Sequence, residues 1–207
     1  MNIHLENIGK KFNTEWIFRD LSFSFEERTA SSILGRNGSG KSTLLQVIAG
    51  NLHPTSGTVT YRCNGNQIAS DDLFKHLTLV APYMELIEDF TLKEMLEFHF
   101  SFKHYLPGYD LASVIELLEF PAMKHKQIRQ FSSGMKQRVK LVLAILSDVP
   151  LILLDEPTMN LDNAGISWYL ELIRKFAGKR TMIICSNLHH TESAFATKSL
   201  QIEDYKR

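Results

Sequence analysis

The sequence lacks several features that define whole classes of protein. It has only two cysteines, Cys63 and Cys185, which lie far apart and in no metal-like spacing. This argues against a disulfide-stapled secreted domain and predicts reduced thiols in a cytosolic protein. The 23 basic and 23 acidic residues balance to a net charge of zero, so a dominant nucleic-acid-binding surface is not expected.

Long apolar runs are also missing. The most apolar region, VKLVLAILSDVPLILLDEP, is interrupted by Lys140, Asp148 and Pro150, and it falls short of the ~20 apolar residues of a membrane helix. The start, MNIHLENIGKKF, has no apolar signal core. We therefore expect a chain that does not cross a membrane by itself. Its 207 residues, 44% of them hydrophobic, are sufficient for one folded domain.

The pattern of apolar residues predicts an α/β fold. IHLENIG and LSFSFEE alternate apolar and polar residues, as half-buried strands do, and indicate antiparallel β structure at the N-terminus. Later, apolar runs such as LILLDE and TMIICS alternate with helical segments, which is typical of a parallel sheet. We expect one domain over residues 1–207, with a helical subdomain at about 85–148. Thr91 with Glu94, and Asp110, predict two helix N-termini there.

A glycine-rich stretch, GRNGSGKS at 35–42, matches the pattern GxxxxGK[ST] between a predicted strand and a predicted helix. Glycines let backbone amides turn toward phosphate oxygens, and the helix N-terminus adds a positive dipole end. A plain glycine-rich turn is the alternative, but the strand-then-helix context favours a P-loop NTPase core. Lys41 would reach the β- and γ-phosphates, and the Ser42 hydroxyl would bind Mg²⁺. The predicted nucleotide contacts are Gly35, Arg36, Asn37, Gly38, Ser39, Gly40, Lys41, Ser42 and Thr43.

An acidic pair ends the apolar run LILLDE. Ligands bind at the carboxyl ends of parallel strands, so Asp155 and Glu156 are candidates for the same site. Alone, such a pair would equally be a solvated turn. Beside a P-loop, we interpret Asp155 as a metal-binding residue and Glu156 as the catalytic base that orients or deprotonates water.

Four segments together resemble the ATP-binding subunits of ABC transporters. They are GRNGSGKS (35–42), FSSGMKQR (131–138), LILLDEP (151–157) and NLD (160–162). The second segment resembles the family signature LSGGQ, with Ser133 in place of a glycine. A plain serine and glycine helix cap is its alternative interpretation. The resemblance covers nearly the whole chain, and the small size is similar to the ATP-binding subunit of the haem exporter group.

The resemblance implies a dimer that sandwiches two ATP molecules. In this family the signature faces the nucleotide of the other copy, which would give Ser132 and the Gly134 amide a role in binding ATP across the dimer. An aromatic residue before the first hairpin usually stacks on adenine. Phe12 fits best, with Trp16 as the alternative. Asp162 resembles the aspartate that links the two ATP sites.

Two departures from the family pattern bear on hydrolysis. The usual glutamine after the strand LTLV is absent from APYMELIED, where Glu85 or Glu88 is a candidate substitute. The usual histidine after the last strand is replaced by Asn187, which we expect to act at the γ-phosphate, and His189 and His190 come too late.

These observations lead to two hypotheses. The first is an ATPase subunit that uses ATP and Mg²⁺ to power a separate membrane-spanning subunit, located in the cytoplasm at the inner face of the membrane. The second is a soluble ATP-gated switch with weak hydrolysis. The aromatic segment LEFHFSFKHYLPGY (96–109) is a candidate contact for the membrane partner, with core packing as an equal alternative. His99 and His104 are interpreted as packing residues.

Overall fold

The computed structural model describes residues 1–176, 178–187, 192 and 194–206. The chain forms two compact units. The first contains residues 1–79, 149–156 and 178–207, and the second contains residues 80–148 and 157–177. The second, helical unit thus includes a segment after residue 156, in addition to the predicted residues 85–148.

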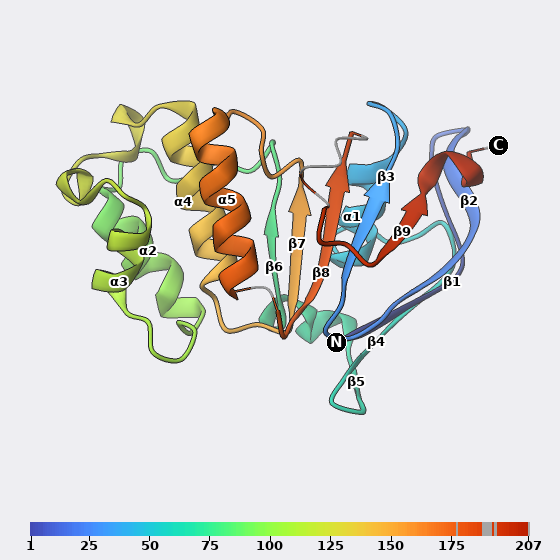
Figure 1. The fold of residues 1–207 in the computed structure, drawn as a ribbon. Coiled ribbons are helices and arrows are strands. Elements are labelled where there is room, and N and C mark those ends of the chain that lie inside the picture. Colours follow the sequence, from blue (N-terminus) through green and yellow to red (C-terminus); the bar gives the residue numbers. More distant parts are fainter. Residues whose placement is uncertain (177, 188–191, 193, 207) are drawn as a thin grey trace. The chain divides into compact units, whose positions relative to one another are not determined.

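The first unit contains two sheets. A four-stranded antiparallel sheet has the order β2-β1-β4-β5, and a five-stranded sheet has the order β6-β7-β8-β3-β9 (Figure 1). In the second sheet β7, β8, β3 and β9 pair in parallel. The bounds are β1 (Asn2–Phe12), β2 (Glu15–Phe25), β3 (Ala30–Leu34), α1 (Lys41–Ile48), β4 (Ser56–Cys63), β5 (Asn66–Ile68), η1 (Ser70–Lys75), β6 (Leu77–Val80), β7 (Leu151–Asp155), β8 (Thr181–Ser186), β9 (Lys198–Gln201) and η4 (Ile202–Tyr205). The predicted α/β fold with antiparallel N-terminal strands and a parallel sheet is confirmed.

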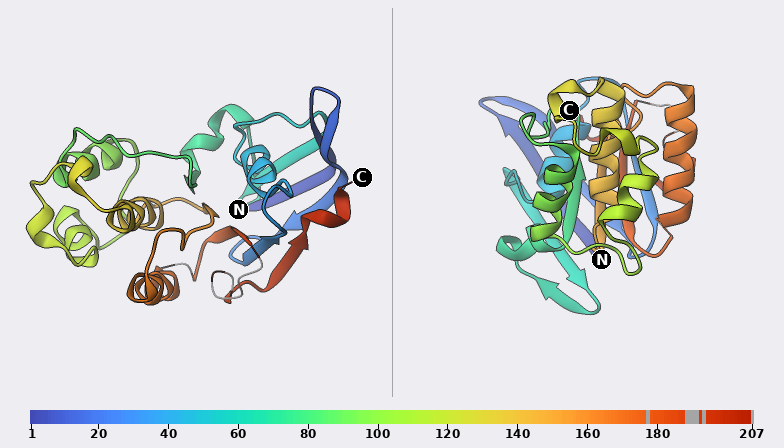
Figure 2. Two further views of the ribbon diagram at one scale, coloured as in Figure 1. Left: turned by 90° about the horizontal axis from the view of Figure 1, so that it is seen from above. Right: turned by 90° about the vertical axis from the view of Figure 1, so that its left-hand side faces the viewer.

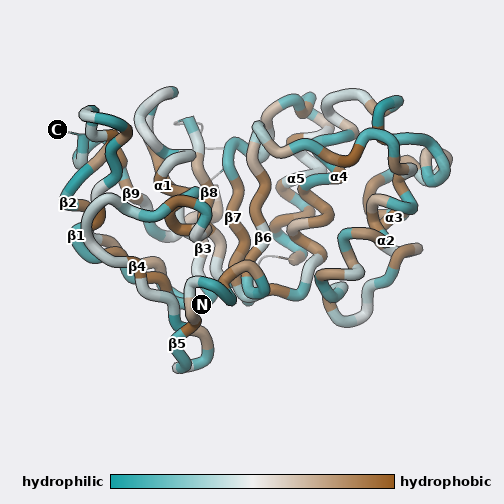
Figure 3. The backbone as a smooth tube through the Cα atoms, turned by 180° about the vertical axis from the view of Figure 1, so that it is seen from behind, coloured by the Kyte–Doolittle hydropathy of each residue, from teal (hydrophilic) through white to brown (hydrophobic). Residues whose placement is uncertain are grey.

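The core of this unit joins both sheets through α1. Leu44, Leu45 and Ile48 of α1 are buried with apolar residues of β1, β2 and β3. Every residue of β7 and β8 is buried, as the unbroken apolar runs predict. Figure 3 shows the hydrophobic colour along β7. Because β3 and α1 are both anchored in this core, the glycine-rich loop between them has fixed ends.

The helical unit is built on capped helices. Its elements are α2 (Leu92–Phe102), α3 (Leu111–Leu117), η2 (Pro121–Met123), η3 (Ile128–Gln130), α4 (Ser133–Ile145) and α5 (Asn163–Phe176). The predicted caps are confirmed: Thr91 and Glu94 form a capping box on α2, and Asp110 caps α3. Figure 2 (right) shows α2 and α3 side by side. Among the described residues, no helix is long and apolar enough to span a bilayer.

Candidate nucleotide-binding site

The loop of residues 35–40 connects β3 to the N-terminus of α1. Gly40 is the N-cap of α1, and no side chain caps this helix. In contrast, the hydroxyl or carboxylate oxygens of Thr91, Asp110 and Ser132 accept backbone N–H bonds at the starts of α2, α3 and α4. The first amides of α1 therefore have no capping side chain and are suited to an anion, which the helix dipole also favours.

Glycine is required at both ends of this loop. A Cβ on Gly40, whose φ is +105°, would lie 2.6 Å from the Cγ2 of Ile17. A Cβ on Gly35 would lie 2.6 Å from the Oγ of Ser39. A side chain at either position would displace its neighbours or the loop, so the close turn of the backbone depends on these two glycines.

Lys41 lies almost fully buried beneath the loop, with 4% of its surface exposed. Its Nζ donates hydrogen bonds to the carbonyl oxygens of Gly35 (2.9 Å) and Arg36 (3.1 Å) and to Oδ1 of Asn187 (2.5 Å). Asn187 follows β8, whose Ser186 is in register with Leu34 at the end of β3. The parallel pairing of β3 and β8 thus places Asn187 next to the start of the loop. His189 and His190 lie outside the described residues.

Asp155 ends β7 with 1% of its surface exposed, and neither carboxylate oxygen has a hydrogen-bond partner in the described part of the chain. Burial raises the pKa of Asp155 above its usual value. The nearby Ser42 hydroxyl, which falls short of hydrogen-bond geometry, acts against this rise, as does Lys41. A buried carboxylate without a partner is costly unless a cation or a donor satisfies it. Asp155 and Ser42 therefore fit a Mg²⁺ site.

The protein side chains alone do not complete such a site. Within the described ranges, no group of three or more His, Cys, Asp or Glu residues could hold a metal ion. Mg²⁺ is commonly held by one or two protein ligands together with water and substrate phosphates. The sparse ligand set at Asp155 and Ser42 matches that arrangement, in which nucleotide and metal bind together.

Glu156 follows Asp155 in an unusual backbone conformation. Its φ is +46°, in the left-handed region that is uncommon for a residue with a side chain. Its N–H donates to the carbonyl oxygen of Cys185 at 3.0 Å, so β8 holds the turn in place. Left-handed non-glycine residues are sparsely populated and often mark functional sites. Glu156 is half-buried, so part of its surface remains open to solvent.

The two candidate adenine-stacking residues differ in exposure. Phe12, at the end of β1, is 48% exposed, and the ammonium of Lys10 lies 5.2 Å from its ring centroid. Trp16 is half-buried, and a Cβ on Gly9 would lie 2.8 Å from its ring. Trp16 therefore packs against β1, whereas Phe12 is the more exposed of the two rings.

The signature and the NLD segment meet in the helical unit. Ser132, Gly134 and Arg138 of the signature segment line a hollow of about 340 Å³ together with Asn160 and Asp162. The hydroxyl of Ser132 accepts the N–H of Met135 at 3.2 Å, and Oδ1 of Asp162 accepts the N–H of Gly165 at 2.8 Å. Each side chain thus caps a helix that begins at this hollow.

Some contacts at these segments were not predicted from the sequence. Gln137 is buried in α4, and its Nε2 donates to the carbonyl oxygen of Pro157 at 2.8 Å. The only feature of the sequence that pointed to this contact was a polar residue, Gln137, before the apolar run of α4. The backbone N–H of Arg36 in the glycine-rich loop donates to Glu203, and no motif marks Glu203.

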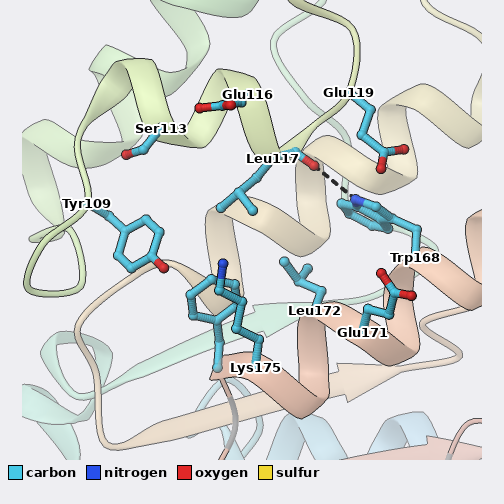
Figure 4. A pocket seen from close by; sticks show the side chains of 10 residues that line it. Tyr109, Ser113, Glu116, Leu117, Glu119, Trp168, Glu171, Leu172 and Lys175 are labelled. Carbon is cyan, nitrogen blue, oxygen red and sulfur yellow. Dashed lines mark hydrogen bonds between the residues drawn. The ribbon is translucent and has the colours of Figure 1, made fainter.

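A second hollow in the helical unit, of about 410 Å³, contains none of the predicted site residues (Figure 4). It lies between α3 and α5. The indole Nε1 of Trp168 donates to the carbonyl oxygen of Leu117 at 2.9 Å (Figure 4). The guanidinium of Arg138 lies 4.9 Å from the Trp168 ring and bonds Glu119 at 2.9 Å. These contacts connect α3, and Glu119 that follows it, to α5 and α4.

Solved structures show the same fold. A putative ABC transporter ATP-binding protein from Pyrococcus furiosus aligns over all of both chains with a TM-score of 0.83 and 18% identity. The dimeric structure of MJ0796, a bacterial ABC transporter cassette, aligns over 97% of this chain and 95% of its own with a TM-score of 0.79 and 25% identity. The P-loop NTPase fold of ABC ATPase domains is therefore confirmed.

Sequence comparison gives the family. The cytochrome c biogenesis ATP-binding export protein CcmA of Brucella abortus is 32% identical over 190 residues, which cover 90% of this chain and 85% of the relative. A family model described as ABC transporter matches residues 18–159. These matches agree with the loop of residues 35–40, called the phosphate loop below, and with the hollow lined by Ser132 and Gly134. They show that the chain belongs to the ABC transporter family, as one of its nucleotide-binding domains.

Proposed function

We propose that this chain binds ATP with Mg²⁺, hydrolyses it, and powers a transporter through a separate membrane-spanning subunit. The single observation that carries this proposal is the grouping of the buried Lys41 ammonium, the uncapped N-terminus of α1 and the unpartnered Asp155 carboxylate within one unit. Together they present a cation, backbone donors and a metal-binding carboxylate, which is the set that phosphoryl transfer requires.

Each residue has a role in that reaction. Lys41 exchanges hydrogen bonds to its present oxygen partners for bonds to the β- and γ-phosphates. The amides from Gly38 to Thr43 would receive the phosphate oxygens, with the Ser39 N–H leaving its present acceptor, the carbonyl oxygen of Arg36. Asp155 and Ser42 would hold Mg²⁺, which would neutralise phosphate charge. Glu156 accepts the proton of the attacking water. Asn187 remains beside Lys41 as a neutral group at the γ-phosphate.

Two copies of the chain form the working unit in this proposal. Ser132, Gly134 and Asp162 line a hollow of the helical unit and would close on ATP held by the other copy. The N-terminus of α4 provides a second set of backbone donors for the phosphates. Phe12 stacks on the adenine. The dimeric MJ0796 structure supports a dimer of cassettes.

An aromatic surface on α2 supports contact with a membrane subunit at the cytoplasmic face of a membrane. Phe98 and Phe102 are 43% and 73% exposed, and their ring centroids lie 5.2 Å apart. Phe90 extends this row, at 5.5 Å from Phe98. Leu96 is buried and Phe100 stacks on Tyr105, so part of the segment packs inward. The exposed row is suited to an apolar partner helix.

A second candidate function is an ATP-gated switch with weak hydrolysis. The observation that favours it is the sequence after β6, where Pro82 and Tyr83 stand in place of the family glutamine. Both are exposed. Of the two acidic candidates to substitute, Glu88 is paired with Lys136. Unless Glu85, the other candidate, provides a polar group for metal and water at this point, ATP would close the dimer while turnover remained slow.

Binding and turnover of MgATP by the purified chain test the proposal. The parent should bind ATP and release phosphate, and Lys41→Ala should abolish both. ATP binding with turnover below one per hour would favour the switch. A parent that binds no ATP, or a Lys41→Ala protein that binds as the parent does, would overturn both candidates. Co-purification with a polytopic membrane protein then separates transporter from switch.

A further inference from the structure

The segment after β9 lies against the phosphate loop. β9 pairs with β3 in parallel, and Gln201 is in register with Leu34. Both strands therefore end at the same edge of the sheet. β3 continues into the loop of residues 35–40, and β9 continues into η4. Oε1 of Glu203 then accepts the backbone N–H of Arg36 at 2.9 Å. A carboxylate acceptor makes this a charge-assisted bond, which is stronger than a neutral one.

Two further contacts follow along the same loop. Nζ of Lys206 donates to the carbonyl oxygen of Gly38 at 3.2 Å. Ile202 is fully buried, and its Cγ2 lies 2.8 Å from the place that a Cβ on Gly35 would take. Its Cδ1 lies 3.5 Å from the corresponding position on Gly40. Residues 202–206 thus contact the start, the crest and the end of the loop.

The loop has bonds of its own, from Lys41 to the carbonyl oxygens of Gly35 and Arg36 and from the Ser39 N–H to the Arg36 carbonyl oxygen, and the contacts from residues 202–206 add to them. Glycines lose more conformational freedom on ordering than any other residue, and a Cβ on Gly38 would meet nothing within 4 Å. A loop that is already ordered before ATP arrives binds the phosphates more tightly, because less entropy is lost in the binding step. Glu203 also accepts the Arg36 N–H, and the Ser39 N–H is bonded to the Arg36 carbonyl oxygen.

We infer that Glu203 and Lys206 are positioning residues that hold the phosphate loop in its ATP-binding shape through Arg36 and Gly38. This inference rests on the proposed ATP binding. Neither residue contacts ATP. Both raise its affinity by ordering the loop, and Ile202 supplies the apolar support beneath it. Residues 202–206 therefore belong to the nucleotide site, although they lie outside the four segments that resemble the family.

The first test compares ATP affinity with turnover. Glu203→Ala should raise the Kd for ATP about five-fold, as expected for one lost hydrogen bond, and leave kcat at saturating ATP within two-fold. Glu203→Gln keeps the acceptor oxygen and should restore most of the affinity. Lys206→Met should weaken ATP binding by about two- to three-fold. Asp204→Ala, at an exposed neighbouring position, is the matched control and should bind as the parent does.

The second test measures hydrogen exchange of a loop amide in the absence of nucleotide. Amide hydrogen exchange by NMR should show the Arg36 N–H protected in the parent, faster in Glu203→Ala, and protected again in Glu203→Gln. Equal exchange in all three proteins would overturn the inference, as would unchanged ATP affinity in both Glu203→Ala and Lys206→Met. Lys41→Ala distinguishes a failure of the positioning role from a failure of the proposed ATP binding. If it abolishes ATP binding while the Glu203 and Lys206 variants bind normally, the proposed function stands and the positioning role is wrong. If the parent itself binds no ATP, both are wrong.

Discussion

The ammonium of Lys41 donates a hydrogen bond of 2.5 Å to Oδ1 of Asn187, across 146 positions of the sequence. The acceptor is a neutral amide, so it orients the lysine without neutralising its charge. An acidic residue here would form an ion pair with Lys41. Asn187 thus holds the Lys41 ammonium in place and leaves its charge available to an anion.

Substitutions of Asn187 should separate its effects on ATP affinity and on turnover. Asn187→Asp should raise the Kd for ATP at least ten-fold, because the new carboxylate binds Lys41 and repels phosphate. Asn187→Ala should lower kcat about ten-fold through loss of a positioned group, and Asn187→His should raise it above the parent. Fluorescent-ATP titration and phosphate release provide the two measurements. Asn64→Asp, at an exposed turn, is the control. Equal ATP affinity in Asn187→Asp and the parent would count against this placement.

Asp155 should lower the stability of the metal-free protein and contribute a ligand when Mg²⁺ binds. Asp155→Asn removes a buried charge without a partner, so the free energy of unfolding without Mg²⁺ should rise by about 1–2 kcal/mol. The same variant should lose the stabilisation that the parent gains from Mg²⁺ with ATP. Thermal unfolding with and without MgATP measures both effects, and Asp148→Asn, at an exposed position, is the control. An Asp155→Asn protein that is less stable than the parent without Mg²⁺ would contradict this account.

Gly40 should tolerate no side chain. Gly40→Ala places a methyl group 2.6 Å from Ile17 at a φ of +105°, and should lower the free energy of unfolding by about 1–3 kcal/mol and abolish ATP binding. Gly178→Ala meets nothing within 4 Å and should leave both unchanged. Denaturant unfolding and ATP titration of the two variants form the test. Normal ATP binding by Gly40→Ala would show that the loop does not need its present shape.

His99 should make stability depend on pH. Its Nε2 is 2.9 Å from the Oγ of Ser147, and burial lowers the pKa of His99 from 6.5 to about 4, with Lys103 adding to the effect. Between these values the unfolded chain binds the proton and the folded chain does not, so stability falls as pH drops from about 6.5 to 4.

The full effect corresponds to about 3 kcal/mol. His99→Gln should remove this part of the pH dependence in denaturant unfolding, whereas His104→Gln, at an exposed position, should keep it. A slope that is the same in His99→Gln as in the parent would show that another group is responsible.

The sequence predicts most of the fold because its signals are local. Apolar runs identify β7 and β8, and the glycine spacing identifies the loop before α1. Thr91 and Asp110 mark the starts of α2 and α3. Asp155 follows from its place at a strand end. These features depend on neighbouring residues, which a single sequence contains.

Contacts between distant segments could not be predicted in this way. Only Leu200 is buried in the short strand β9, so the sequence has no apolar periodicity that would predict this strand. The contact between Glu203 and Arg36, which are 167 residues apart, follows from the pairing of that strand and could not be predicted either. The residues from 157 to 177 belong to the helical unit, although β7 separates them in sequence from α4. Both facts depend on which strands pair, and pairing is set by the whole core.

The central claim is that the phosphate loop is half of an ATP site that a second copy completes. Size-exclusion chromatography of Glu156→Gln with MgATP tests it most directly, because the variant keeps the shape of the site and lacks the base. We predict a shift to dimer with ATP, none without it, and none with ATP in the double variant that adds Ser132→Arg. A Glu156→Gln protein that binds ATP and remains monomeric, or a dimer that persists unchanged with Ser132→Arg, would contradict the claim.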